Sequence, residues 1–94
     1  MALDYGLLMK MPNTDEIPDD IRFLTLLHNI GAISPERSLS IEEISRWAAI
    51  GPHEVREKLL KLSSKRYVDF CISGNVRRYY VTVEGMRKVL STYS

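Results

Sequence analysis

The side chains best suited to a chemical role are cationic, and most of them lie in the second half of the chain. Residues 51–94 contain nine Lys and Arg against four Asp and Glu, whereas residues 1–50 contain four against eight. The net charge of all 94 residues is only +1. Screening confines each charge to about 8–10 Å at physiological salt, so a basic half attracts phosphate groups even in a nearly neutral molecule.

These cations fall on two neighbouring segments that face a common partner in our interpretation. The first segment is a run with helical spacing after Gly51-Pro52, and the second is a hairpin that ends in Arg77-Arg78. Guanidinium and ammonium groups bind phosphate oxygens, and side chains on a helix in the major groove read base edges. We expect contacts with double-stranded DNA from eight residues: Arg46, His53, Arg56, Glu57, Lys61, Lys65, Arg77 and Arg78.

The face of the predicted recognition helix leaves alternatives open. His53 is suited to binding a phosphate or to serving as an ordinary polar residue of a first helical turn. Phosphates repel the carboxylate of Glu57, although it can accept a hydrogen bond from the amino group of cytosine. Leu60 could touch a thymine methyl group or belong to a protein interface.

The hairpin residues also have two interpretations. Charged residues at an exposed strand edge discourage aggregation, but we favour DNA contact for Arg77 and Arg78. Side chains alternate along a strand, so the two arginines point to opposite faces and a single one is expected to reach DNA. Tyr79 and Tyr80 are expected to pack against helices, with stacking on bases as the minor alternative.

No catalytic, cofactor or metal site is predicted, and the chain is not expected to be an enzyme. The five glycines form no phosphate-binding loop, and no Ser/His/Asp or Cys/His set shares an element. Cys71 is the sole cysteine, so it cannot form an internal disulfide. We expect it to serve as a small apolar residue within a strand.

Apolar spacing predicts three helices that position these side chains. The first helix starts at Asp19 and ends at Gly31. Ser40 and Glu43 form a capping box for a second helix, which begins at Ile41 and stops at Ile50-Gly51. Its predicted buried side is Ile41, Ile44, Trp47 and Ala48. A tight glycine turn leads to a third helix with Pro52 at its first position and a core stripe of Val55, Leu59 and Leu62.

The periodicity changes from helical to alternating after Lys65-Arg66. Two β-rich runs around Ser73-Gly74-Asn75 predict a hairpin, and Thr82 is suited to cap a last helix that carries Met86, Val89, Leu90 and Tyr93. The fold class is therefore α+β: a winged helix made of a three-helix bundle with a helix-turn-helix, a β-hairpin wing and an additional C-terminal helix.

The run from Leu39 to Gly85 resembles the winged helix-turn-helix domains of MarR-like transcription regulators from bacteria and archaea. The motif Lys-Gly-Tyr/Leu-Val of that family corresponds to residues 65–68, with Arg66 in place of glycine. The motif Arg-Arg-x-Tyr-x-Leu-Thr-x-x-Gly resembles residues 77–85, which have one position fewer between the tyrosine and the threonine. The resemblance implies a DNA-binding regulator with Arg77 and Arg78 at or near the tip of its wing.

The chain is expected to be one winged-helix domain over residues 1–94, with an N-terminal extension (1–14), a core (19–83) and a C-terminal helix (84–94). The extension is either a short helix or a strand around residues 5–9. The apolar run at residues 7–9 is too short for a membrane span, and no secretory signal is visible, so we expect a cytoplasmic, intracellular protein.

Two partners are expected. Double-stranded DNA is the first. The second is another copy of the chain, because the apolar residues of the N-terminal segment and the C-terminal helix lie outside the core motif and need a covering surface. The alternative function is that of a winged-helix module for protein–protein interaction within a larger assembly, which Glu54, Glu57 and Leu60 favour.

Overall fold

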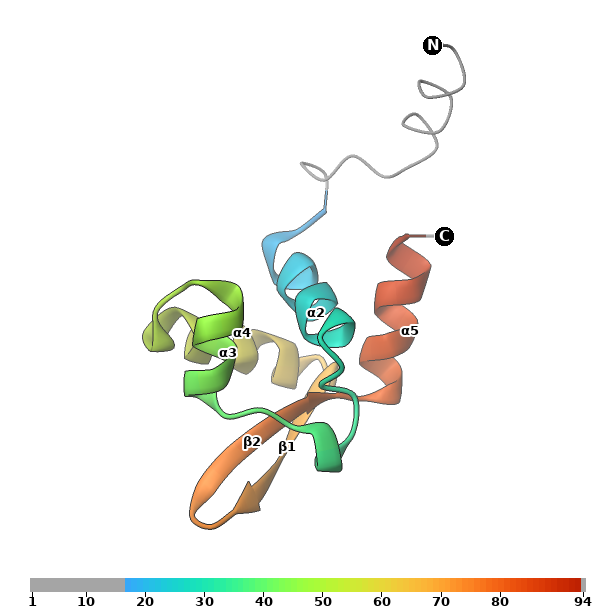
Figure 1. The fold of residues 1–94 in the computed structure, drawn as a ribbon. Helices are drawn as coiled ribbons and strands as arrows, with labels where there is room; N and C mark the ends of the chain where they lie inside the picture. The colour runs from blue at the N-terminus through green and yellow to red at the C-terminus, as the bar shows by residue number, and fades with distance from the viewer. Residues whose placement is uncertain (1–16, 94) are drawn as a thin grey trace, which may run out of the picture.

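The architecture is a bundle of helices with a β-hairpin that projects from one end (Figure 1). A computed structural model describes residues 17–93, so the predicted N-terminal extension lies outside the described residues. The order of elements confirms the predicted order of helix, helix, helix, hairpin and helix. The elements are α2 (Asp19–Asn29), the 3-10 turn η2 (Pro35–Arg37), α3 (Ile41–Ala48), α4 (Pro52–Ser64), β1 (Val68–Ser73), β2 (Val76–Val81) and α5 (Val83–Thr92).

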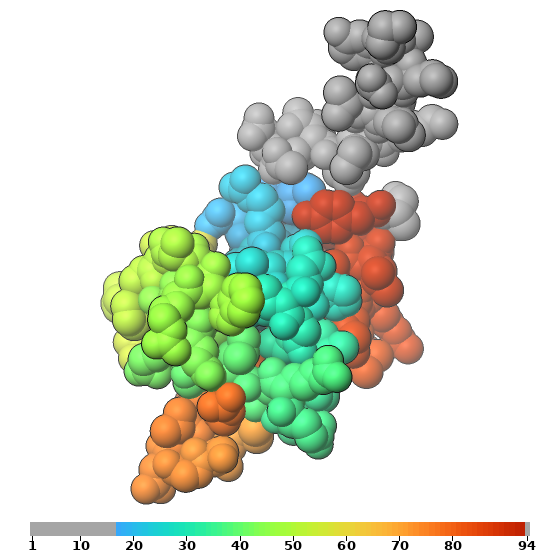
Figure 2. All heavy atoms as spheres, in the orientation of Figure 1, coloured from blue at the N-terminus to red at the C-terminus, as the bar shows by residue number. Residues whose placement is uncertain are grey.

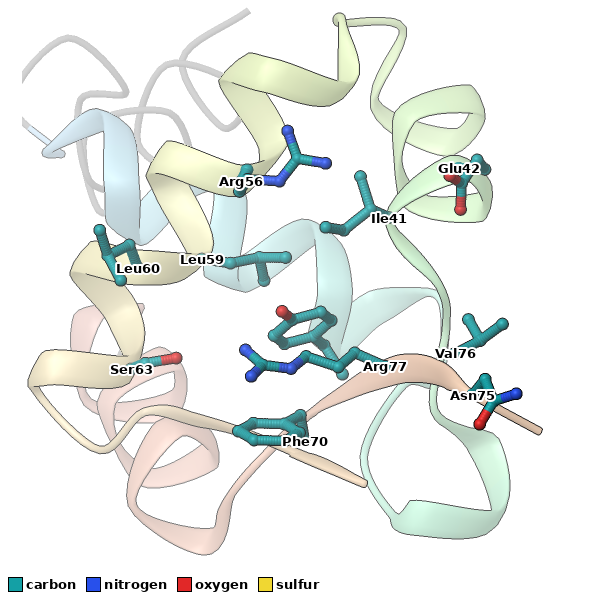
Figure 3. A pocket seen from close by; sticks show the side chains of 11 residues that line it. Ile41, Glu42, Arg56, Leu59, Leu60, Ser63, Phe70, Asn75, Val76 and Arg77 are labelled. Carbon is teal, nitrogen blue, oxygen red and sulfur yellow. The ribbon is translucent and has the colours of Figure 1, made fainter. Parts of the chain in front are cut away.

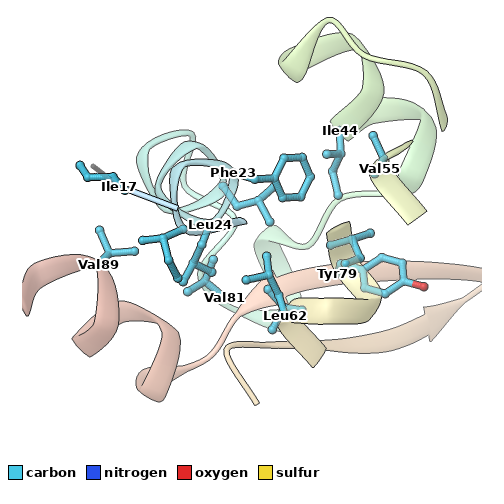
Figure 4. Packing of buried hydrophobic residues seen from close by; sticks show 13 residues of the cluster. Ile17, Phe23, Leu24, Ile44, Val55, Leu62, Tyr79, Val81 and Val89 are labelled. Carbon is cyan, nitrogen blue, oxygen red and sulfur yellow. The ribbon is translucent and has the colours of Figure 1, made fainter. Parts of the chain in front are cut away.

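One hydrophobic core joins the helices to the base of the hairpin (Figure 4). The predicted stripe of α4 is confirmed, because all three of its members are buried. Each buried aliphatic side chain of this size stabilises the fold by roughly 1.5–3 kcal/mol relative to an exposed one. The largest fully buried side chains are Leu24, Leu27, Ile44, Val55, Leu59, Leu62 and Val81.

Side-chain caps fix where α3 and α5 begin. The capping box predicted for α3 is confirmed: Ser40 Oγ accepts from the Glu43 N–H at 3.2 Å, and Glu43 Oε1 accepts from the Ser40 N–H at 2.9 Å. Thr82 Oγ1 accepts from the Gly85 N–H at 3.0 Å, which confirms the predicted cap of α5. These bonds satisfy amide groups that have no partner within their own helices.

The turn between α3 and α4 differs from the expected glycine turn. The helix α3 ends at Ala48 rather than Ile50, and Ala49 takes the left-handed conformation with a φ of 57°. Gly51 has a φ of −70° and lies before α4 as its cap residue, with Pro52 at the first helical position as predicted. The turn therefore places its backbone strain on an alanine, where an L-residue loses roughly 1–2 kcal/mol.

Trp47 was expected on the buried side of α3 and is 61% exposed, so that prediction is wrong. Successive helix residues are about 100° apart, which places Trp47 and Ala48 on opposite sides of the fully buried Ile44. Ile41 lies on the same side as Ala48, and both pack against the core. The core thus covers that flank of α3 and leaves the Trp47 flank open.

The hairpin closes with a two-residue turn at its tip. Its strands are antiparallel, with Val68 opposite Val81 and Ser73 opposite Val76. Gly74 and Asn75 have φ values of 55° and 67°, as a turn that matches the strand twist requires. At the other end, Arg66 has a φ of 63°, so the arginine occupies a left-handed position where the resembled family usually has glycine.

Gly85 lies where α5 crosses the base of the hairpin. A Cβ atom at this position would overlap the carbonyl oxygen of Tyr67 and lie 2.7 Å from Val81 Cγ1. The Thr-x-x-Gly motif therefore has two physical causes, which are the cap that Thr82 supplies and the close approach that Gly85 allows.

We expect Gly85→Ala to lower the free energy of unfolding by about 1–3 kcal/mol, since the backbone at Tyr67 must move to admit a methyl group. Urea denaturation measures this loss. Gly51→Ala is the matched control, because a Cβ there meets no atom within 4 Å and the φ suits alanine. Equal losses at both glycines would contradict the packing argument.

Candidate nucleic-acid interface

A groove of about 710 Å³ lies between α4 and the hairpin (Figure 3). The helix α4 forms one wall, β1, β2 and the hairpin turn form the other, and the first residues of α3 contribute as well. Its surface is mostly apolar, with two arginines and one carboxylate among the lining side chains. The lining residues are Ile41, Glu42, Arg56, Leu59, Leu60, Ser63, Phe70, Asn75, Val76, Arg77 and Tyr79.

Arg56 and Arg77 bring positive charge to this groove from its two walls, α4 and β2 (Figure 3). The Arg77 guanidinium carbon lies 4.4 Å from the centre of the Phe70 ring, and that ring lies 5.9 Å from the ring of Tyr79. This stack orients Arg77 without neutralising it. Within residues 17–93, neither guanidinium has a carboxylate partner, so both are available to an anion.

Arg78 points to the other face of the hairpin, as strand alternation predicted. Its Nη2 donates to the backbone oxygen of Ser38 at 2.7 Å and lies 3.2 Å from Glu43 Oε1. Glu43 also accepts from the Ser40 N–H, and this bond, followed by the charge of Arg78, holds the pKa of Glu43 below its ordinary value of 4.5. Arg78 therefore connects the wing to the start of α3.

The outer face of α4 carries both signs of charge. His53 Nε2 lies 3.6 Å from Glu57 Oε2, one helical turn away. Lys58 contacts Asp19 of α2 and lies 3.8 Å from Glu54, and its ammonium group lowers the pKa of Asp19. These three acids reduce the positive field along α4, which makes this face of the helix less cationic than the groove beside it.

The eight predicted contact residues occupy five places. Arg56 and Arg77 share the groove, whereas His53, Glu57 and Lys61 lie along the outer face of α4. Arg46 lies with Glu43 and Trp47 at a separate shallow pocket on α3. Lys65 donates from its ammonium group to Asp20 of α2 at 3.3 Å, and Arg78 contacts Glu43 at the start of α3.

The aromatic floor of the groove, formed by Phe70 and Tyr79, was not predicted from the sequence. Phe70 pairs with Tyr79 across the hairpin, and Ile72 pairs with Arg77 on the same face. Side chains of residues two apart on neighbouring strands are within reach of each other, so the register alone would have placed Phe70 near Arg77. The ion pairs of Lys58 and Lys65 with α2 carry no such local signal, because they join residues 39 and 45 positions apart.

Over residues 17–93 the structure has neither a cluster of metal ligands nor a membrane-spanning helix. No group of three His, Cys, Asp or Glu residues in this range could hold a metal ion. In the same range, no helix has the length and apolar character that crossing a membrane requires.

We expect the two neighbouring arginines to differ in their effect on stability. Arg78→Ala removes a half-buried, charge-assisted hydrogen bond and leaves Glu43 without its cation, so the free energy of unfolding falls by about 1.5–3 kcal/mol. Arg77→Ala removes an exposed ring contact and lowers it by about 1 kcal/mol or less. Thermal denaturation of both variants measures the difference, and a larger loss for Arg77→Ala would contradict these roles.

Comparisons with known proteins rest on structure, since no protein-family model and no curated protein matches the chain. The DNA-binding TubR fragment from Clostridium botulinum aligns with a TM-score of 0.67 and 20% identity, over 78% of this chain and 91% of that one. TubR from Bacillus megaterium pBM400 aligns with a TM-score of 0.66 and 17% identity, over 92% of each chain.

A third structure is the S. aureus MepR F27L mutant bound to an oligodeoxyribonucleotide. It aligns with a TM-score of 0.68 and 15% identity, over 83% of this chain and 56% of MepR. Three alignments at this level of identity identify a shared fold. The chain has an α+β winged-helix fold, with α3 and α4 as its helix-turn-helix and the β1–β2 hairpin as its wing.

Proposed function

We propose that the protein binds double-stranded DNA and acts as a transcription regulator of the MarR-like kind. The observation that carries this proposal is the pair of guanidinium groups, Arg56 and Arg77, which line one groove from the recognition helix and the wing. With α4 in the major groove and the wing over the next minor groove, the intervening phosphate backbone passes between these two elements. Both arginines then contact phosphates of that backbone.

Two further features support duplex DNA as the partner. The structural neighbours include a TubR fragment described as DNA-binding and a MepR variant solved with an oligodeoxyribonucleotide. Lys61 is exposed on the outer face of the same helix and adds a third cation to the proposed interface. A regulator of this kind acts inside the cell, so we also propose a cytoplasmic location. We propose no catalytic activity.

Glu57 gives the proposed interface a means of selecting sequence. It lies near the middle of α4, where a side chain in the major groove meets base edges, and a carboxylate accepts hydrogen bonds from the cytosine amino group. Its neighbour His53, 3.6 Å away, holds the carboxylate toward the start of the helix. We therefore expect readout of few positions, with most of the affinity supplied by phosphate contacts.

The first test of DNA binding is its dependence on salt. Log affinity falls with log salt, and each phosphate contact contributes about 0.9 to the magnitude of that slope. Replacing both residues, Arg56→Gln with Arg77→Gln, is therefore expected to make the slope shallower by roughly 2. Fluorescence anisotropy with a labelled duplex at several salt concentrations measures it. Arg87→Gln is the control, because Arg87 lies on α5 and is already 3.6 Å from Glu84.

Two results would contradict the proposed function. Absence of duplex binding by the wild-type protein at low salt excludes DNA as the partner. An unchanged slope in the double variant, with binding retained, removes the groove arginines from the interface.

One observation favours a protein partner as the second candidate. Leu60 is 73% exposed on α4, beside the apolar floor of the groove. A protein surface would cover that leucine better than a phosphate backbone does. Failure of duplex binding in the same titration would make a protein-interaction module the better interpretation of this face.

We also propose that the protein forms a homodimer through its N-terminal segment and α5. The helices α2 and α5 border a cleft of about 610 Å³, and Leu90, which lines it, is 61% exposed. Tyr93 is exposed beside it. A second copy that covers these side chains would remove apolar surface from water, which is the main driving force of association.

Leu90→Glu is expected to convert the dimer to a monomer, because it places a charge at the centre of the covered surface. Sedimentation velocity at tens of micromolar measures the change. Val83→Glu is the control, since Val83 is 57% exposed at the other end of α5 and does not line the cleft. A wild-type protein that sediments as a monomer at this concentration would contradict dimer formation.

A further inference from the structure

The tip of the wing carries no charged side chain and exposes two apolar ones, in contrast to the arginines behind it. Residues 72–76 read Ile-Ser-Gly-Asn-Val. Ile72 is 66% exposed, and Val76 is exposed as well. Figure 2 shows the hairpin as a projection that extends away from the helical body. An exposed isoleucine at the end of such a projection contributes nothing to the core of its own chain.

The register of the hairpin places Ile72 level with Arg77, on the same face. Ile72 lies directly opposite Arg77, and both are on the face that carries Phe70. The Arg77 side chain is drawn back over the Phe70 ring into the groove, with its guanidinium 4.4 Å from the ring centre. Ile72 is therefore the large side chain nearest the tip on the face that turns toward α4.

The width of the tip sets a condition on its entry into the minor groove of DNA. The two-residue Gly74–Asn75 turn adds no large side chain beyond the strands. Neighbouring strands are about 4.8 Å apart, and the minor groove of B-DNA is about 6 Å wide. A two-stranded tip with side chains therefore enters only a widened groove. Proteins that widen the minor groove insert apolar side chains between base steps and kink the duplex.

We propose that Ile72 is an apolar wedge that enters the minor groove and bends the DNA. This inference rests on the proposed DNA-binding function and names a further contact for it. Arg77 contacts a phosphate and supplies a salt-dependent part of the affinity. Ile72 contacts the edges of a partly unstacked base step and supplies a part that does not depend on salt. Pyrimidine–purine steps, which unstack most readily, are the favoured sites.

The experiment measures bending and affinity together. Duplexes of about 30 base pairs, chosen by selection on the wild-type protein from a random pool, carry a donor dye at one end and an acceptor at the other. We expect binding of the wild-type protein to shorten the distance between the ends. Ile72→Ala should abolish most of this shortening and weaken binding on the order of tenfold, with the salt slope unchanged.

Two variants serve as controls. Ile72→Leu retains an apolar side chain of the same volume and should restore both the bend and the affinity. Val83→Ala removes methyl groups from a similarly exposed valine on α5 and should behave as the wild-type protein does. All three substitutions are at exposed positions, so none of them is expected to disturb folding.

The possible failures are distinguishable. An unbent wild-type complex, or an Ile72→Ala complex that is bent and bound as tightly as the wild type, overturns the wedge and leaves DNA binding intact. Weaker binding by Ile72→Ala with a reduced salt slope also overturns it, because the loss would then come from phosphate contacts. Absence of duplex binding by the wild-type protein overturns the proposed function itself.

Discussion

The attachment of the wing to the segment between α2 and α3 is the constraint on which the interface depends. Leu39 and Tyr79 exchange two backbone hydrogen bonds, of 2.9 and 2.7 Å, and the Val81 N–H donates to the Ala32 oxygen at 2.7 Å. These bonds hold β2 against the chain that leads into α3. Because α3 packs on α4, they also set the separation of α4 and the wing. The groove between them is therefore a product of backbone hydrogen bonding, and its arginines are placed before any partner arrives.

This constraint explains why adjacent arginines have different roles. Strand alternation sends Arg77 toward α4 and Arg78 toward Ser38 and Glu43. The Arg78 pair reinforces the backbone attachment at the point where the capping box starts α3. A charge held between two fixed partners lends rigidity to the wing, whereas Arg77, held by a ring alone, remains free to neutralise a phosphate. The two adjacent arginines thus have different roles because a strand has two faces. Arg78 supports the wing, and Arg77 is free to meet an anion.

Much of the fold was predictable because its signals are local. The capping box at Ser40 and the stripe on α4 each need only a few neighbouring residues, and both are confirmed. The predicted burial of Trp47 is wrong because periodicity identifies the apolar arc of α3 but not which end of that arc the core covers. The site was less predictable for a similar reason. The partners of Lys65 and Arg78 are set by tertiary packing, and the left-handed Ala49 has no sequence signature comparable to glycine.

The balance of charge between α4 and the wing determines how such an interface would discriminate. Glu54 and Glu57 weaken the attraction of α4 for phosphates, so non-specific affinity must come from the groove and the wing. A carboxylate in the major groove is repelled wherever no amino group faces it, and this penalty is itself a source of specificity. The wedge proposed at Ile72 would add a second source of specificity, because the cost of opening a base step depends on the sequence that is opened. Discrimination then arises from what α4 and the tip reject, while the groove arginines attract every duplex alike.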